Sequence, residues 1–252
     1  NVLGSHTEMT IESRMLVRVN HSLKIPEIDS TSVKDIQIEK ERSILLLRLC
    51  YIDKIEKQSE IEHILKKIDI ENKSIIEIAQ QCNAYVFEHF TYTKGITNIE
   101  TTVDEILILK KGVCQDFAHI LLHLLRTAGI PSRYLSGYIC PNESGLRGEG
   151  ATHAWVEIYT PNQGWLGLDP TNNIWTMDNH VRLSVGRNFS DCTPIKGTFK
   201  GLARQTLSVC VSIGYEDGRQ FEEINDVKLQ EVSSKVQEQL NYMDQLQQQQ
   251  QQ

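Results

Sequence analysis

No stretch of this sequence is long and apolar enough to cross a membrane, because a spanning helix needs about 20 consecutive apolar residues. The opening segment NVLGSHTEMT also lacks the apolar core of a signal peptide. We therefore expect no membrane association, and we predict a cytoplasmic location.

Cysteine pairs and basic runs are missing as well. The 6 cysteines are scattered without a CxxC pair, so we expect reduced thiols and no disulfide scaffold. The formal net charge is -7, and aromatic residues are not interleaved with basic ones, which argues against nucleic acid as a partner. Hydrophobic residues make up 40% of the 252 positions, enough to fill the core of one large domain or two small ones.

Two capping-box patterns mark helix starts. Residues 74–77 (SIIE) precede apolar residues at helical spacing and predict a helix over residues 75–90. Residues 102–105 (TVDE) open a second, short helix that we expect to end near Gly112.

Residues 113–127 are apolar on nearly every side, which is typical of a helix buried in the middle of a domain. The following AGIP, residues 128–131, supplies a glycine stop and a trailing proline. Strand-like runs then occupy residues 132–139, 153–159 and 165–169. Helices followed by antiparallel strands predict the α+β class.

Beyond residue 172, the runs 181–185 and 207–213 alternate like strands, and we expect the sheet to continue through them. Residues 227–252 are predicted to form a C-terminal helix followed by a glutamine-rich tail. The apolar stripe of that helix is expected to pack on its own domain, and an assembly contact is the alternative.

The first 70 residues carry no visible chemistry. Residues 15–19 alternate like a strand, and residues 35–58 have the apolar stripe of an amphipathic helix. We treat residues 1–70 as an N-terminal region that forms a small or partial separate domain.

Cys114 stands at the start of the buried helix, in KGVCQDFAHILLHLLR. Unpaired backbone N–H groups and the helix dipole favour negative charge there, which stabilises a thiolate and makes it a better nucleophile. The alternative is a small buried apolar residue, as we expect for Cys82. Asp116, in the first helical turn, is expected to have a structural role.

A reactive thiol needs a histidine to accept its proton and a third group to orient that histidine. In THAWVEIY, His153 lies on one face of a strand, and a short turn leads to the strand that ends at Asp169. If Tyr159 pairs with Trp165, His153 and Asp169 are diagonal neighbours on the same face, about 7–8 Å apart at the backbone. The hairpin therefore predicts a histidine–carboxylate pair.

The motifs GVCQDFAHILLHLLRTAGIPSRYLSGY, THAWVEIY and GWLGLDPTNN closely resemble those of the bacterial transglutaminase-like group of cysteine enzymes, in the same order. The resemblance covers about residues 74–213. It implies a papain-like, transglutaminase-like core in which a buried catalytic helix packs on an antiparallel β-sheet. Asn188 departs from the pattern, since the family more often has an acidic residue there.

The resemblance implies that Cys114 is the nucleophile, His153 the general base and acid, and Asp169 the orienting carboxylate, within a catalytic domain over residues 71–226. The implied chemistry is acyl transfer from a protein or peptide amide through a thioester, ending in hydrolysis, with no cofactor and no metal. The alternatives are transfer to an amine, as in a protein-glutamine transglutaminase, and a catalytically silent binding module. The oligomeric state stays open.

The first oxyanion donor expected from the helix start is the Cys114 backbone N–H. Animal transglutaminases use a tryptophan as the second donor, and no tryptophan precedes Cys114 in this chain. The second donor stays open among Asn83, Tyr92, Asn98 and Gln115.

Other signals have structural explanations. His119 and His123 have the spacing of zinc ligands, but no acidic third ligand stands out, and we expect ordinary histidines at a helix–sheet contact. Trp155 is expected either to wall an acyl site or to pack against Trp165. We expect the glycine-containing loop over residues 141–150 to be a mobile rim that admits substrate.

Overall fold

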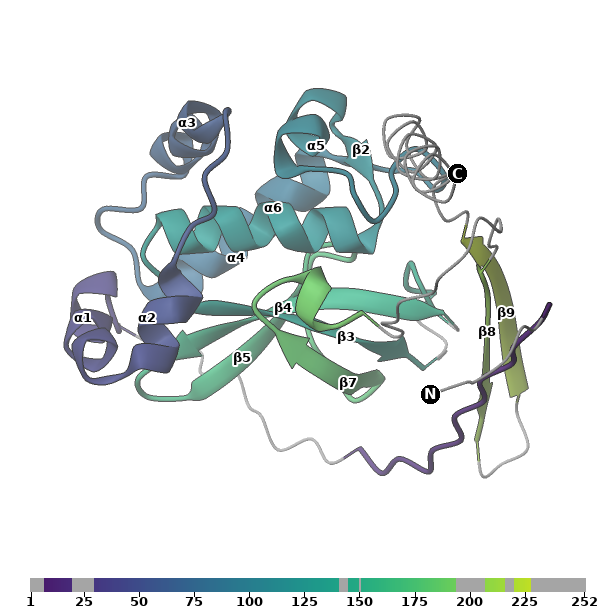
Figure 1. The fold of residues 1–252 in the computed structure, drawn as a ribbon. Coiled ribbons are helices and arrows are strands. Elements are labelled where there is room, and N and C mark those ends of the chain that lie inside the picture. The colour runs from purple at the N-terminus through teal and green to yellow at the C-terminus, as the bar shows by residue number, and fades with distance from the viewer. Residues whose placement is uncertain are drawn as a thin grey trace, which may run out of the picture.

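The computed structural model describes residues 7–19, 30–140, 145–149, 151–193, 207–215 and 220–227 (Figure 1). The described helices are α1 (Val33–Arg42), α2 (Ile44–Cys50), α3 (Gln58–Ile68), α4 (Ile75–His89), α5 (Val103–Leu109), α6 (Cys114–Thr127) and the 3-10 turn η1 (Phe189–Asp191). The described strands are β1 (Thr91–Tyr92), β2 (Lys111–Gly112), β3 (Ser132–Ile139), β4 (Thr152–Thr160), β5 (Gly164–Asp169), β6 (Ile174–Trp175), β7 (His180–Gly186), β8 (Leu207–Gly214) and β9 (Gln220–Val227).

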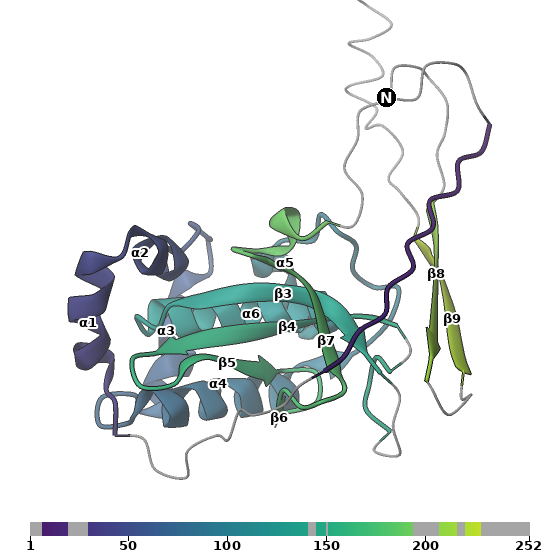
Figure 2. The same ribbon diagram turned by 90° about the horizontal axis from the view of Figure 1, so that it is seen from below.

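The central sheet has the order β6-β5-β4-β3-β7, and neighbouring strands are antiparallel. Helices α4 and α6 cover one face of this sheet (Figure 2). This arrangement confirms the predicted α+β class with a buried helix packed on an antiparallel sheet.

One expectation about the sheet is partly wrong. Strand β7 extends it by pairing with β3, as expected, but β8 pairs with β9 in a separate two-stranded sheet within the described part of the chain. Alternation of apolar and polar residues along a segment predicts a strand with one apolar and one polar face. It does not predict which other strand that segment pairs with.

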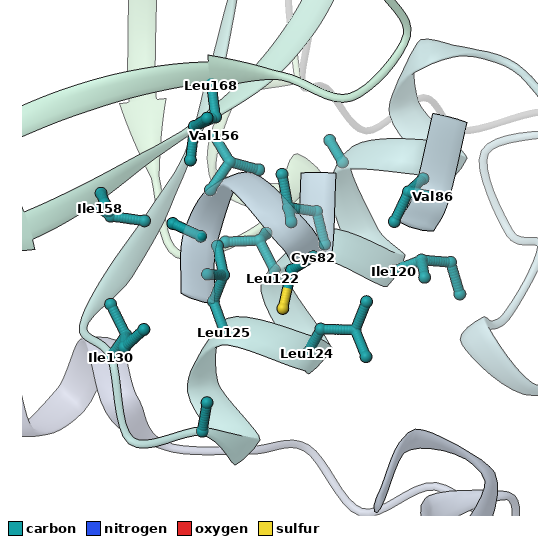
Figure 3. Close-up of a cluster of buried hydrophobic side chains, with 14 of the residues drawn as sticks. Cys82, Val86, Ile120, Leu122, Leu124, Leu125, Ile130, Val156, Ile158 and Leu168 are labelled. Carbon is teal, nitrogen blue, oxygen red and sulfur yellow. The ribbon is translucent and has the colours of Figure 1, made fainter. Parts of the chain in front are cut away.

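Helix α6 lies beside α4 on the same face of the sheet, and its side chains supply the middle of the core (Figure 3). Leu122 and Leu124 of α6 belong to one buried cluster with Cys82 of α4 and with Val156 and Leu168 of the sheet. A helix with neighbours on several sides needs apolar residues around most of its circumference. This packing confirms the buried positions predicted for α6 and for Cys82.

The helix boundaries follow their caps. At the start of α4, the Ser74 hydroxyl accepts a hydrogen bond from the Glu77 backbone N–H, while the Glu77 carboxylate accepts from the Ser74 backbone N–H. The predicted second box is present at α5, although that helix ends at Leu109 and not near Gly112, because Lys110 adopts a left-handed conformation. Gly129, with φ of +83°, follows the end of α6.

Two expectations for the N-terminal region need correction. Residues 15–19 are not a strand: no described strand pairs with them, and Leu16 is 99% exposed. Residues 35–58 do not form one helix, because α1 and α2 are separated at Ser43, whose hydroxyl accepts a hydrogen bond from the Leu46 backbone N–H and caps α2.

Helices α1 and α3 share the main core, to which they contribute Ile36, Ile61 and Ile64. The division of the chain at residue 70 stays a prediction. The predicted C-terminal helix lies outside the described residues, apart from Val227 at the end of β9. Among the described residues, no helix is long and apolar enough to cross a membrane.

Candidate active site

Cys114 is the first residue of α6 and is only partly buried. The first backbone hydrogen bond of this turn runs from the Phe117 N–H to the Val113 carbonyl, so the N–H groups of residues 114–116 precede the regular helical ladder. The thiol therefore combines access from outside with a helix start that favours negative charge.

The Asp116 carboxylate fixes the backbone just before Cys114. Its Oδ2 accepts hydrogen bonds from the Val113 backbone N–H at 2.7 Å and from the Thr97 hydroxyl at 2.6 Å. Gly112 leaves room for this carboxylate, because an added Cβ would lie 2.7 Å from the Asp116 Cβ. These contacts support the structural role expected for Asp116. Burial raises the pKa of Asp116, and the hydrogen bonds from Thr97 and Val113 oppose that rise.

The predicted hairpin register is correct. Tyr159 pairs with Trp165, and the β4–β5 ladder continues to Val156 opposite Leu168. His153 and Asp169 are both buried, and His153 Nε2 lies 2.9 Å from Asp169 Oδ2. The structure thus brings together the histidine and the carboxylate that the sequence predicts as a pair.

Asp169 is held by more than His153. Its Oδ1 accepts a hydrogen bond from the Thr171 backbone N–H at 2.9 Å, and its Oδ2 also accepts from Asn172 Nδ2 at 2.7 Å. A second histidine, His180, places Nε2 3.3 Å from the same Oδ2. Burial would raise the pKa of Asp169, but the charge of His153 and the hydrogen bonds from the two histidines and Asn172 lower it below its usual range.

The ring of His153 is oriented by the carboxylate. Burial opposes its protonation, yet the charge and hydrogen bond of Asp169 raise the pKa of His153 above its usual value, and interaction with the Cys114 thiol raises it further. His153 Nε2 contacts Asp169 Oδ2, whereas His153 Nδ1 has no hydrogen-bond partner among the described residues. Nδ1 is therefore the ring nitrogen that does not contact the carboxylate.

Trp155 packs against the site and not against Trp165. Its ring stacks on His153 at a centroid distance of 6.2 Å and meets His180 edge to face at 5.4 Å, whereas Trp165 packs against Tyr159. Of the two roles expected for Trp155, the structure favours a wall of the site over packing on Trp165.

The described part of the 141–150 loop, residues 145–149, lies beside His153. Gly148 has a φ of +86°, and a Cβ added there would lie 2.7 Å from His153 Nδ1, so only glycine fits without strain. Asn172 ties this loop to the site, since it accepts a hydrogen bond from the Arg147 backbone N–H and donates to the Arg147 carbonyl. The mobility expected of the loop stays a prediction.

The structure narrows the choice of a second oxyanion donor. Asn83 is buried on α4, and its side-chain NH₂ donates both hydrogens, to the Asp169 carbonyl at 3.3 Å and to the Asn173 side chain at 3.1 Å. It therefore has no free donor. Tyr92, Asn98 and Gln115 stay open as predictions.

Among the described residues, which include His119 and His123, no group of three or more histidine, cysteine, aspartate or glutamate side chains is placed to hold a metal ion. His119 accepts a hydrogen bond from the Phe189 backbone N–H and packs against Tyr134. Burial, the neighbouring His123 and Arg126 lower the pKa of His119 to about 4. Both observations agree with the structural role expected for this histidine.

Sequence reasoning missed His180 and Asn172. His180 opens β7 one residue before the alternating run, and Asn172 lies in the DPTNN motif. A histidine directly before a predicted strand and an amide close to Asp169 were available signals, but neither spacing indicates that both side chains reach one carboxylate oxygen. Asn188 stands where the family more often has an acidic residue. Its side-chain oxygen accepts hydrogen bonds from the Ser190 backbone N–H and from the Ser190 hydroxyl.

Comparison with known proteins identifies relatives of this chain. An uncharacterized protein of Mycobacterium leprae is 30% identical over 213 residues, which cover 82% of this chain and 74% of the relative. An uncharacterized protein of Mycobacterium bovis is 36% identical over 133 residues, 50% of this chain and 42% of the relative. A Pseudomonas aeruginosa protein-glutamine gamma-glutamyltransferase is 34% identical over 104 residues, 38% of this chain and 16% of that protein.

The fold has a counterpart among solved structures. A Cytophaga hutchinsonii protein named "Putative Cysteine Protease" matches with a TM-score of 0.50 and 21% identity, over 75% of this chain and 58% of that one. The family model of the transglutaminase-like superfamily matches residues 62–170, a range that contains Cys114, His153 and Asp169. This chain belongs to the transglutaminase-like superfamily.

Proposed function

We propose that the protein is a thiol-dependent acyl-transfer enzyme that acts on peptide or side-chain amides through a thioester intermediate and releases the acyl group by hydrolysis. One observation supports this most strongly. Asp169 contacts one ring nitrogen of the buried His153, Nε2, and this leaves the other ring nitrogen, Nδ1, for the partly exposed Cys114 thiol. The roles of nucleophile, base and orienting carboxylate match the requirements of thiol catalysis.

In the first half of the reaction, His153 Nδ1 takes the proton of Cys114, and the thiolate sulfur attacks the amide carbonyl carbon. The carbonyl oxygen becomes an oxyanion, and the backbone N–H of Cys114 at the helix start is its proposed donor. When the C–N bond breaks, His153 returns the proton to the leaving nitrogen. The products of this half are an amine, or ammonia from a side-chain amide, and a Cys114 thioester.

In the second half, His153 accepts a proton from water, and the oxygen attacks the thioester. The C–S bond breaks, the carboxylic acid leaves, and Cys114 recovers its proton. Asp169 stays ionised throughout, because its lowered pKa makes it an acceptor for the His153 ring and not a proton carrier.

Transfer of the acyl group to an amine is the second candidate function. It is supported by the 34% identity to a Pseudomonas aeruginosa protein-glutamine gamma-glutamyltransferase, over 104 residues that make up 16% of that protein. In that case an amine replaces water in the second half, and the thioester chemistry is otherwise the same. Protein or peptide substrates are proposed for both candidates.

The two candidates are separated by incubating the full chain with a mixed peptide library in heavy-oxygen water, with and without a labelled primary amine. Hydrolysis should place heavy oxygen at new peptide carboxyl ends or at converted glutamine side chains. Transfer should place the amine label on glutamine side chains. Mass spectrometry of the peptides detects both products, and we expect hydrolysis to dominate.

The control variants are Cys114→Ala, which removes the proposed nucleophile, and Cys210→Ala, which removes an exposed thiol on β8. All product should disappear in the first variant and persist in the second. Equal product from the Cys114→Ala chain would contradict the proposal. A folded wild-type chain without product, whose Cys114 is no more reactive than Cys210, would favour the alternative that the chain is a catalytically silent binding module.

The cytoplasmic location stays a prediction.

A further inference from the structure

His180 is a buried histidine that the proposed chemistry does not use. It is the first residue of β7, and its Nε2 lies 3.3 Å from Asp169 Oδ2, the same oxygen that His153 Nε2 contacts at 2.9 Å. The side chain of His180 is 2% exposed and that of Asp169 is fully buried. A buried carboxylate oxygen shared by two imidazole rings calls for a functional explanation.

The contacts of His180 define which of its nitrogens carries the proton. The Met177 backbone N–H donates to His180 Nδ1 at 3.2 Å, so Nδ1 is an acceptor. A neutral ring with Nδ1 as acceptor carries its hydrogen on Nε2 and donates it to Asp169.

The neighbouring Asn179 agrees with this assignment once its side-chain oxygen and nitrogen are exchanged. Its Oδ1 lies 3.0 Å from His180 Nδ1, while its Nδ2 is buried without a partner among the described residues. Exchange of the two amide atoms, which have nearly the same shape, places an N–H donor on Nδ1 and relieves the unpaired nitrogen. Both Met177 and Asn179 then donate to Nδ1, and Nε2 faces Asp169 as a donor.

We propose that His180 is a positioning residue that holds the Asp169 carboxylate in the orientation in which it presents His153 Nδ1 to Cys114. This inference rests on the proposed function, because it assigns His180 to the same site. The other contacts to Asp169 side-chain oxygens come from Thr171 and Asn172, which follow it directly in the chain, and from His153 itself. Among the described residues, His180 is the contact that anchors the carboxylate to β7.

The packing around the two rings supports this role. Trp155 contacts both, stacked on His153 and edge to face with His180, and the histidine rings lie 6.3 Å apart. The titratable groups that face Asp169 are His153 and His180, and those that face His153 are Asp169 and Cys114. A carboxylate that loses its donor on the β7 side can rotate, and His153 then turns away from the thiol.

The test compares the rate at which iodoacetamide alkylates Cys114 in wild type and in His180→Phe. Phenylalanine keeps an aromatic ring against Trp155 but has no donor for Asp169. We expect about a tenfold slower reaction at pH 6, because small displacements of a reacting group have large effects on rate. The acid limb of the rate profile should also move to higher pH, since the His153 imidazolium is less firmly held.

Rescue distinguishes positioning from simple packing. In His180→Gln the side-chain amide nitrogen can take the place of Nε2 and should restore most of the rate, whereas in His180→Asn the shorter amide cannot reach Asp169 and should not. If His180→Phe does not fold, the comparison of His180→Gln with His180→Asn still tests whether a donor to Asp169 is needed. His63→Phe, at an exposed histidine on α3, is the matched control for the substitution itself.

A folded His180→Phe chain that reacts as fast as wild type would overturn the inference and leave the proposed function intact, and so would equal rates for the glutamine and asparagine variants. A wild-type Cys114 that reacts no faster than Cys210, with no slowing in His153→Ala, would instead overturn the proposed function and the inference together. Thermal unfolding of each variant verifies that the rates refer to folded protein.

Discussion

Single residues at the start of α6 decide how the Cys114 thiol is presented. Gly112 has no side chain, and the Asp116 carboxylate occupies the space where its Cβ would be. That carboxylate binds the Val113 N–H and the Thr97 hydroxyl, so the turn into the helix is held from two sides. The position two residues before Cys114 therefore has a strict limit on side-chain size.

We predict that Gly112→Ala lowers the free energy of unfolding by about 1–3 kcal/mol, the usual cost of forcing an extra methyl group into a packed site. Asp116→Ala removes the group with which the new methyl collides. The double variant should therefore be less destabilised than the sum of the two single variants. Urea unfolding of the three chains measures this coupling, and strictly additive losses would show that the Asp116 contact is not the cause.

The sequence predicts the site residues that local patterns define. The start of a buried helix predicts Cys114, and a two-residue alternation followed by a turn predicts His153 with Asp169. His180 could not be found in this way. Its contact with Asp169 depends on how the chain crosses from β6 to β7, and no local period contains that information.

At the scale of elements, caps and stops predicted the helices well because they act within one turn. The α4 box and the glycine after α6 lie where the sequence places them. The failures are of another kind. Residues 15–19 alternate but have no described partner strand, and β8 pairs with β9 and not with the central sheet. Pairing depends on distant segments, so it follows from tertiary packing and not from propensity.

At the scale of the whole molecule, the buried His153–Asp169 pair links stability to pH. Asp169 has a lowered pKa in the folded state, so its contribution is present above the unfolded value of about 3.9 and is lost as the pH falls. His153 has a raised pKa, so its contribution is present below about 6.5 and is lost as the pH rises through the folded value. The pair therefore stabilises the fold most between about pH 4 and 6.5.

We predict that Asp169→Asn destabilises the protein most in that window, by on the order of 3 kcal/mol, because it leaves a buried histidine without its charge partner. The difference from wild type should shrink below pH 4 and at alkaline pH. Urea unfolding at acidic, intermediate and alkaline pH measures it, with the exposed Asp178→Asn as the matched control. A pH-independent difference would indicate that the pair is not ionised in the folded protein.

The most direct test of the central claim is the rate of Cys114 alkylation as a function of pH, in wild type and in His153→Ala, with the other 5 cysteines followed separately by mass spectrometry. A thiolate paired with the His153 imidazolium should react rapidly well below the free-thiol pKa of about 8.5, and loss of the histidine should slow it at least tenfold at pH 6. Ordinary thiol titration of Cys114 in both chains would contradict the account, because it would mean that no reactive pair is assembled.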